Sequence, residues 1–460
     1  MTMSFSPTRE TRAPRGRTVL ATAVLGALGL LAVYGVASFA LPGDADVQRF
    51  SSGIFDMDVS RVVADLATGQ RAYRQSVHPL QKLLVAPFGQ ALNAGLFGGR
   101  NPLGAARLVI AVCMTLQTLA AGALAWQLAR RSLSAALAAA CLCAFSFSTW
   151  LAASIPESAA VASLATALPL LFLNARWGRA FPPWEAVCWG LLAVLGVGLT
   201  LTQLVHWIIA LGVRTTFGRE RSEAGAGAGA HAVWPRLVLT GVLFAVLFWG
   251  GLRLQSGIYP QATRVTAEHP LAVELHFLRT GHLAAAPVSH AGRLIGHFLV
   301  FDFVAPFPGH SDFLIRDYGL DYWSLSVEEA GLAQWAPAQI ALAGAVLLAA
   351  LAACAGLPRA DAKFVAPALC VVSKLALHLV YGREYVLYSP HWHGVLVAVL
   401  VAAAWNRLPR RRAALLAAAA VLSAAMLQND LVVMRAVYRE LEAGLGTRGR
   451  DAVGALRGAE

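Results

Sequence analysis

Residues 103–126 read LGAARLVIAVCMTLQTLAAGALAW, and this stretch decides the fold class. It contains one charged residue, Arg107, near its start. An α-helix of this length is roughly 36 Å long, whereas the hydrocarbon core of a bilayer is about 30 Å thick. The stretch therefore predicts a membrane-spanning helix.

The composition of the whole chain agrees with this prediction. Of the 460 residues, 57% are hydrophobic and 13% are charged, whereas soluble proteins average roughly 25% charged residues. This excludes an ordinary soluble enzyme and a disordered protein. The chain carries 37 basic against 25 acidic residues, a net charge of +12. In a membrane protein such an excess is typical of basic cytoplasmic loops, so we expect no nucleic-acid partner.

The cysteines and histidines do not form metal-binding patterns. All six cysteines lie in apolar runs, where neither a disulfide framework nor a zinc site is expected. Six histidines fall between residues 269 and 310, but their spacings match neither H-x-x-x-H nor H-E-x-x-H. We therefore predict no cofactor, and a divalent cation at an acid pair is the one alternative left open.

Apolar runs predict about eleven transmembrane helices, and hence an all-α polytopic membrane protein. The first run, 18–41, follows four arginines, which favours an uncleaved anchor with a cytoplasmic N-terminus. A cleaved signal peptide is the alternative for this run. The other predicted spans are 103–126, 133–151, 157–174, 186–199, 201–213, 237–254, 336–357, 364–381, 391–406 and 413–428.

The runs 186–199 and 201–213 are each shorter than the roughly 20 residues that a straight span needs, so one long span is an alternative. Loop charge favours two spans, because the cytoplasmic segments then hold 18 of the 37 basic residues and four acids. The predicted organisation follows from this choice: a cytoplasmic tail 1–17, a transmembrane module 18–215 with outer loop 42–102, a cytoplasmic linker 216–236, a second module 237–428 with outer loop 255–335, and an extracytoplasmic tail 429–460.

Each outer loop is expected to carry a short helix at the membrane surface. In the first loop, an apolar stripe at helical spacing is formed by Met57, Val59, Val62, Val63 and Leu66. In the second loop, residues 293–303 are apolar but too short for a span. They predict an interfacial or re-entrant helix.

Acidic residues near the membrane are candidates for catalysis. Asp56 and Asp58 lie two residues apart in the first outer loop, where a carboxylate could act as a general base or bind a cation. Glu157 follows Pro156 at the start of a predicted span, where the helix dipole favours an anion. The structural alternatives are a solvated acidic loop for the aspartates and a simple stabilising role at the helix end for Glu157.

Basic residues in the outer loops are candidates for binding an anion. His78-Pro79-Leu80 and Lys82 lie where the first loop returns to the membrane. A turn followed by a lysine that extends toward water is the alternative. Arg293 is one of four arginines in the second outer loop that could bind a phosphate, and a solvated position is its alternative.

The late hairpin at residues 381–393 combines ionisable and aromatic groups in a short segment. It holds Arg383, Glu384, Tyr388 and His391 among two further tyrosines, a tryptophan and a second histidine. Tyr and Trp are common anchors at a membrane interface, which explains the aromatic residues. This does not explain Arg383 and Glu384, so we predict that the hairpin binds substrate.

Together these positions resemble the GT-C superfamily of membrane glycosyltransferases, which includes the protein O-mannosyltransferases and the lipid A aminoarabinose transferases. Those enzymes have many spans, an acidic motif in the first outer loop, a Lys- or His-Pro-Pro-Leu-like element after it, and a second acid near a later span. The matching segments are Asp56-Met57-Asp58, His78-Pro79-Leu80 and Pro156-Glu157-Ser158, with Leu80 in place of the second proline. The turn at 200–203 and the hairpin at 382–389 are also similar. The resemblance covers roughly residues 18–215 and, beyond them, the topology and the hairpin.

The resemblance implies an inverting transferase at the extracytoplasmic face of a membrane, and the Ala-rich composition with more Arg than Lys suggests a bacterial cytoplasmic membrane. The donor would be a polyprenyl-phosphate-linked sugar, and the acceptor a hydroxyl of a glycan, lipid or protein. Asp56 or Asp58 would be the general base, with Asp56 preferred by analogy, and Glu157 would orient a substrate. Arg383, His78 or an arginine of the second outer loop would stabilise the leaving phosphate.

Two other classes remain open. A lipid or solute transporter or flippase would carry ionisable groups within its spans, and the exceptions to an otherwise uncharged interior are His206, Lys374 and His378. A non-catalytic subunit of an envelope assembly would tolerate replacement of the loop acids.

Overall fold

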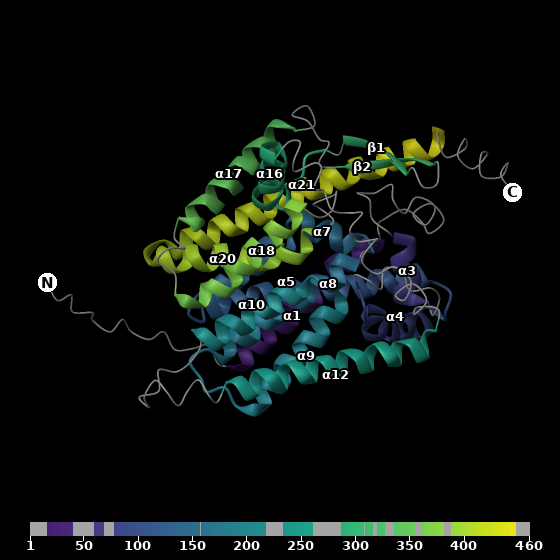
Figure 1. The fold of residues 1–460 in the computed structure, drawn as a ribbon. Helices are drawn as coiled ribbons and strands as arrows, with labels where there is room; N and C mark the ends of the chain where they lie inside the picture. Colours follow the sequence, from purple (N-terminus) through teal and green to yellow (C-terminus); the bar gives the residue numbers. More distant parts are fainter. Residues whose placement is uncertain are drawn as a thin grey trace.

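The computed structural model describes residues 16–39, 59–68, 78–156, 158–217, 233–260, 287–307, 309–315, 320–326, 335–355, 361–380 and 388–447. Within these residues the protein is helical except for one antiparallel hairpin of strands β1 (Gly309–Ile315) and β2 (Leu320–Ser326). The long helices lie side by side in one bundle, with α3, α4 and the hairpin toward one end (Figure 1).

The helices are α1 (Gly16–Phe39), α3 (Val59–Ala67), α4 (Gln81–Phe97), α5 (Pro102–Leu128), α6 (Leu133–Ala144), α7 (Phe147–Ser154), α8 (Ser158–Arg176), α9 (Pro183–Leu199), α10 (Gln203–Thr216), α12 (Trp234–Ile258), α16 (Pro287–Gly296) with a π-helical turn (His297–Phe301), α17 (Pro337–Cys354), α18 (Val365–Val380), α20 (Pro390–Arg407) and α21 (Arg412–Thr447).

Six described helical segments are long and apolar enough to cross a membrane, and a bent pair of helices would make a seventh. They are α5, α8, α12, α17, the segment Ala362–Leu379 and the segment Pro409–Val437, with α6 and α7 as the bent pair. These segments indicate a multi-pass membrane protein. The sequence prediction of about eleven spans is higher because it included four further helices: α1, α9, α10 and α20. α9 and the part Ala23–Ala37 of α1 are apolar but shorter than these segments, and α10 and α20 do not meet the same length and hydropathy criteria.

The predicted span 133–151 is not one straight helix. The chain bends by 61° between α6 and α7. At the bend, the backbone N–H of Phe147 donates to Phe303 O at 3.2 Å, and that of Ser148 donates to Asp302 O at 3.0 Å. The first N–H groups of a helix lack intrahelical acceptors, so these distant carbonyls stabilise a new helix start at this point.

The predicted boundary at residue 429 does not interrupt the last helix. α21 continues through it to Thr447. The side chain of Gln339 donates to Asn429 Oδ1 at 2.9 Å, and Asn429 Nδ2 donates to Ala305 O at 3.2 Å. Asp430, the next residue, is fully buried. Polar contacts to the rest of the bundle therefore hold the segment that the sequence assigned to a separate tail.

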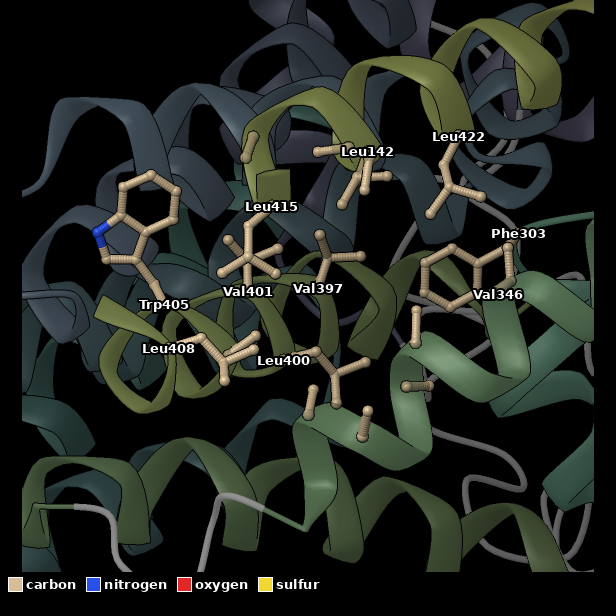
Figure 2. A pocket seen from close by; sticks show the side chains of 18 of the residues that line it. Leu142, Phe303, Val346, Val397, Leu400, Val401, Trp405, Leu408, Leu415 and Leu422 are labelled. Carbon is tan, nitrogen blue, oxygen red and sulfur yellow. The ribbon is translucent and has the colours of Figure 1, made fainter. Parts of the chain in front are cut away.

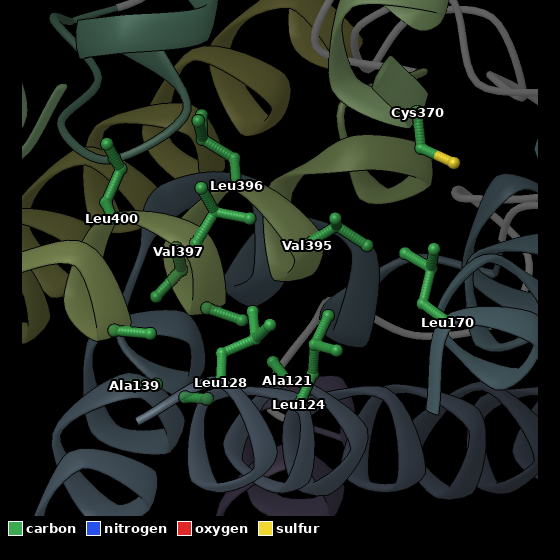
Figure 3. Close-up of a cluster of buried hydrophobic side chains, with 14 of the residues drawn as sticks. Ala121, Leu124, Leu128, Ala139, Leu170, Cys370, Val395, Leu396, Val397 and Leu400 are labelled. Carbon is green, nitrogen blue, oxygen red and sulfur yellow. The ribbon is translucent and has the colours of Figure 1, made fainter. Parts of the chain in front are cut away.

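The centre of the bundle is α5, the helix quoted first from the sequence. Of its most apolar stretch, 67% is buried, against 6% for α12. Figure 3 shows part of the core, in which Leu124 and Leu128 of α5 meet Leu170 of α8 and Val395 of α20. α5 is thus surrounded by other helices, whereas α12 has an outer face free to contact lipid.

The predicted interfacial helices are both present as helices. α3 covers most of the predicted stripe, and Val62, Val63 and Leu66 are buried within the protein core. Residues 293–301 continue α16 into the π-helical turn, which ends before Asp302. The helical content predicted for both outer loops is therefore confirmed.

The two short runs around Thr200 form two helices, as loop charge predicted. α9 and α10 are joined by a turn at 200–202. We call the end of the bundle that carries this turn the Thr200 end. The opposite end, where α20 finishes, is the Arg407 end.

A buried ion cluster joins α9 and α10 at the Arg407 end. Glu185 is fully buried and accepts hydrogen bonds from Arg214 Nε at 2.7 Å and Nη2 at 3.1 Å. Arg176 of α8 also donates to Glu185, at 2.9 Å. Arg214 further donates to the carbonyls of Arg179 and Ala180. These charge-assisted hydrogen bonds fix the three helices relative to one another.

Replacing Glu185 by Gln is expected to lower the free energy of unfolding by roughly 3–5 kcal/mol, because Arg214 would remain buried without its counter-charge. The measurement is unfolding in detergent, followed by circular dichroism. Asp361→Asn is the control, since Asp361 is an exposed acid at the same end. Equal stability of the two variants would contradict a structural role for the ion cluster.

The contact between α3 and α4 requires glycine at position 89. A Cβ atom there would overlap the backbone oxygen of Leu66, whereas a Cβ at Gly95 of the same helix would have no neighbour within 4 Å. Gly89→Ala is therefore expected to displace α3 and to expose it to limited proteolysis. Gly95→Ala, the control, should be neutral or stabilising by up to about 1 kcal/mol, since alanine favours helix. Equal proteolysis of both variants would refute the close packing.

Candidate functional site

The His78-Pro79-Leu80 segment is attached to the end of α9. His78 Nδ1 lies 2.7 Å from Leu199 O, and because a carbonyl only accepts, the ring donates through Nδ1. The backbone N–H of Leu80 donates to Gly198 O, also at 2.7 Å. Both acceptors are carbonyls of the last turn of α9, which lack donors within their own helix. The end of α9 thus fixes the position of His78.

A second contact orients the same segment from α12. Gln255 is buried, and its Nε2 donates to Pro79 O at 2.8 Å while its Oε1 accepts from the N–H of Leu83 at 2.9 Å. The amide of one side chain therefore satisfies two backbone groups at the start of α4.

Lys82 forms an ion pair instead of extending toward water. It is buried, and its Nζ lies 3.4 Å from Asp65 Oδ1 of α3 and 5.3 Å from the centre of the Tyr259 ring. Burial lowers the pKa of Lys82 from its ordinary value, and the neighbouring Asp65 opposes that shift. These contacts connect α3, α4 and the end of α12, so Lys82 contributes to the support of the site.

The turn between α9 and α10 lies beside two buried bases, Lys374 and His206. In the sequence, both are ionisable residues within otherwise uncharged apolar runs. Lys374 of α18 is buried and donates from Nζ to Thr202 Oγ1 at 2.9 Å. His206 of α10 is buried, and its Nε2 lies 3.2 Å from Cys370 O, so it donates through Nε2. Its Nδ1 has no hydrogen-bond partner among the described residues.

The start of α20 brings His391 to the same place. His391 is buried, and its Nε2 has no hydrogen-bond partner among the described residues. The Tyr388 ring lies 6.4 Å from it and stacks on His378 of α18, with ring centres 4.8 Å apart. His378 also contacts Trp392, at 4.9 Å.

Five bases from four parts of the chain therefore converge at the Thr200 end. We call them the basic cluster: His78, His206, Lys374, His378 and His391. The other four members lie close enough to His391 for their charges to act on it. Lys374 is a buried N–H donor, and the buried Nε2 of His391 has no hydrogen-bond partner among the described residues. These two side chains can bind an anion, and a phosphate is the common biological anion with several oxygen acceptors.

The described residues provide no metal site. They contain no group of three or more His, Cys, Asp or Glu side chains that could hold a metal ion.

A buried acid that the sequence interpretation did not select lies behind Trp392. Asp302 accepts a hydrogen bond from Trp392 Nε1 at 2.7 Å and lies 3.9 Å from His393 Nδ1. Burial raises the pKa of Asp302 well above its ordinary value, while hydrogen bonds from Trp392 and Ser389 oppose the shift. The signal available in the sequence was an acid inside the apolar run 298–307. Asp302 fixes the Trp392 ring that contacts the basic cluster, so it positions the site from behind.

The structure brings together three of the predicted site residues and separates two others. His78, Tyr388 and His391 meet at the basic cluster. Lys82 pairs with Asp65, and Arg293 is exposed on α16, with no contact to the cluster among the described residues. The remaining predicted residues lie outside the described ranges: Asp56, Asp58, Glu157, Arg383 and Glu384.

Searches against protein-family models, curated proteins and solved structures found no match to this chain.

Lys374→Met is expected to weaken binding of an amphipathic phosphate by about tenfold or more, because a hydrogen bond to a charged group contributes roughly 1.5–3 kcal/mol. Dodecyl phosphate is the probe, and native mass spectrometry of protein in nanodiscs measures the bound fraction. Lys363→Met, eleven positions earlier and at the Arg407 end, is the control. Equal binding by the two variants would contradict an anion site at the basic cluster.

Proposed function

We propose that the protein is a membrane glycosyltransferase that moves a sugar from a polyprenyl-phosphate donor to an acceptor hydroxyl. The observation that carries the proposal is the basic cluster. It lies at the Thr200 end, the end at which the sequence resemblance puts the donor phosphate. It includes His78 and His391, two residues selected for phosphate binding from the sequence.

The charge distribution supports an extracytoplasmic position for the Thr200 end. The described basic residues at the Arg407 end outnumber the acids there, Glu185 and Asp361; they are Arg130, Arg131, Arg176, Arg179, Arg214, Arg236, Lys363, Arg407, Arg410, Arg411 and Arg412. By the positive-inside rule the Arg407 end faces the cytoplasm. The proposal also puts α1, α9, α10 and α20 inside the bilayer, which gives eleven spans in a bacterial cytoplasmic membrane.

The chemistry assigned to the cluster is charge stabilisation at the leaving group. The acceptor oxygen attacks the anomeric carbon of the sugar, and the bond from that carbon to the phosphate oxygen breaks. Lys374 and His391 neutralise the charge that develops on the departing polyprenyl phosphate. His78 is oriented by the donation of its Nδ1–H to Leu199 O and adds a further base beside these two side chains.

The remaining roles come from the resemblance. Asp56 takes the proton of the acceptor hydroxyl, Glu157 orients a substrate, and Arg383 adds a further cation at the phosphate. A single displacement inverts the configuration at the anomeric carbon. The acceptor is a glycan, a lipid or a protein.

The first test is to identify the lipid that the protein retains. Native mass spectrometry of the purified protein is expected to detect a polyprenyl-phosphate sugar, which also names the sugar. His391→Ala should reduce its retention, and His290→Ala, outside the cluster, should not. No polyprenyl phosphate in any preparation would contradict the proposal.

Asp56→Asn is expected to abolish consumption of the bound donor in the presence of source membranes, while donor retention is unchanged, because the variant lacks only the base. Asp46→Asn is the control from the same loop. Mass spectrometry of the donor and the released polyprenyl phosphate provides the readout. Activity lost in Asp58→Asn but kept in Asp56→Asn would exchange their roles. Full activity in both variants would exclude a base from this pair.

A lipid-phosphate flippase is the second candidate, favoured by one observation. His206 and Lys374 lie on the apolar helices α10 and α18 and not in a loop. A flippase would bind the polyprenyl phosphate, depend on the cluster, and leave the sugar attached. Translocation without consumption of the donor would replace the transferase proposal with this one.

A further inference from the structure

An apolar groove separate from the basic cluster lies between α6, α17, α20 and α21. It encloses about 200 Å³. Its lining includes Leu142, Val346, Leu400 and Leu422, one from each helix, and Figure 2 shows these side chains around the open space. The stretch of α20 along the groove, Val397 to Trp405, is about 12 Å long at 1.5 Å per residue. A groove of this kind suits part of a hydrocarbon chain.

The two ends of the groove differ in charge. At one end lies Phe303, next to the buried Asp302, and the α21 stripe of Leu422 and Met426 continues to the buried Asp430. At the other end Arg407 itself lines the groove. Arg407 therefore attracts an anionic head group to the second end.

Three more arginines follow Arg407 closely in the chain. Arg410, Arg411 and Arg412 connect α20 to α21 and are exposed. The guanidinium of Arg412 lies over the Trp405 ring, 5.5 Å from its centre. From Pro390 through Asn429 the chain contains no acid, so no carboxylate of this stretch competes for the arginines.

Trp405 provides a further polar group at this end. Its Nε1 is buried and has no hydrogen-bond partner among the described residues. Figure 2 shows the indole at one end of the groove, with its nitrogen on the side away from the leucines, and Phe303 at the other end. In membrane proteins, tryptophan is enriched at the level of the lipid head groups.

We propose that this groove binds one anionic phospholipid, with an acyl chain along α20 and the phosphate at Arg407 and Arg412. The lipid belongs to the leaflet at the Arg407 end. It is a structural ligand that fills the gap between α17, α20 and α21. The inference does not depend on the proposed transferase function, because the basic cluster lies at the opposite end of α20.

The test uses the full chain in nanodiscs of phosphatidylcholine with a minor fraction of phosphatidylglycerol. After release into detergent, native mass spectrometry is expected to detect one retained phosphatidylglycerol. Arg412→Gln should reduce its retention about fivefold, which corresponds to the ~1 kcal/mol that one basic residue contributes near an anionic lipid surface. Arg236→Gln, at the same end but on α12, should leave retention unchanged.

A second pair of variants tests the groove itself. Ala418 lines it and Ala417 does not, although both are exposed on α21. Ala418→Phe should abolish retention of phosphatidylglycerol, and Ala417→Phe should not. Neither variant should change binding of dodecyl phosphate at the basic cluster, which shows that the protein is still folded.

Four results would overturn the proposal. They are equal retention of phosphatidylcholine, equal loss in Arg236→Gln and Arg412→Gln, retention that survives Ala418→Phe, and a polyprenyl phosphate in place of the phospholipid.

Discussion

The last carbonyls of α9 are the constraint on which the site depends. A helix leaves its final carbonyl groups without intrahelical donors, so other groups must satisfy them. Here Gly198 O and Leu199 O accept from the N–H of Leu80 and from His78 Nδ1. Because α9 and α10 turn back at Thr200, these carbonyls face the start of α4. The turn between α9 and α10 therefore also determines the position of His78.

The same turn determines which other bases can reach His78. Thr202 accepts from Lys374, and His206, one turn into α10, contacts Cys370 of the same helix α18. At the opposite end, Glu185 and Arg214 hold α9 and α10 together. A short hairpin of two helices, fixed at its base by an ion pair and at its tip by hydrogen bonds, therefore organises α4, α18 and α20 around one site.

The sequence predicted this hairpin but not every boundary, and the difference has a physical explanation. The break near Thr200 was visible because loop charge reports the side of the membrane on which each turn lies. The bend after α6 was not visible, because its acceptors, Asp302 O and Phe303 O, are about 155 positions away in the chain. The continuation of α21 through Asn429 depends in the same way on Gln339 and Ala305. Local composition therefore predicts a turn that is marked by loop charge, but it does not predict a helix boundary that depends on residues distant in the chain.

The residues of the site differ in the same way: some are visible in the local sequence, and others are recognised only from the packing of the helices. His78 and His391 could be selected from short motifs, whereas Lys374, His206 and His378 appeared as isolated exceptions within apolar runs. Their convergence is a property of helix packing.

Burial makes that convergence informative about the ligand. Burying one cation without a counter-charge is costly, and burying several close together is costlier. On the proposed function, a phosphate bound beside Lys374 would offset the cost of burying that cation, because an anion close to a base favours its charged form. An uncharged head group would offer no such compensation, so the burial of these bases is the reason to expect a preference for an anionic ligand.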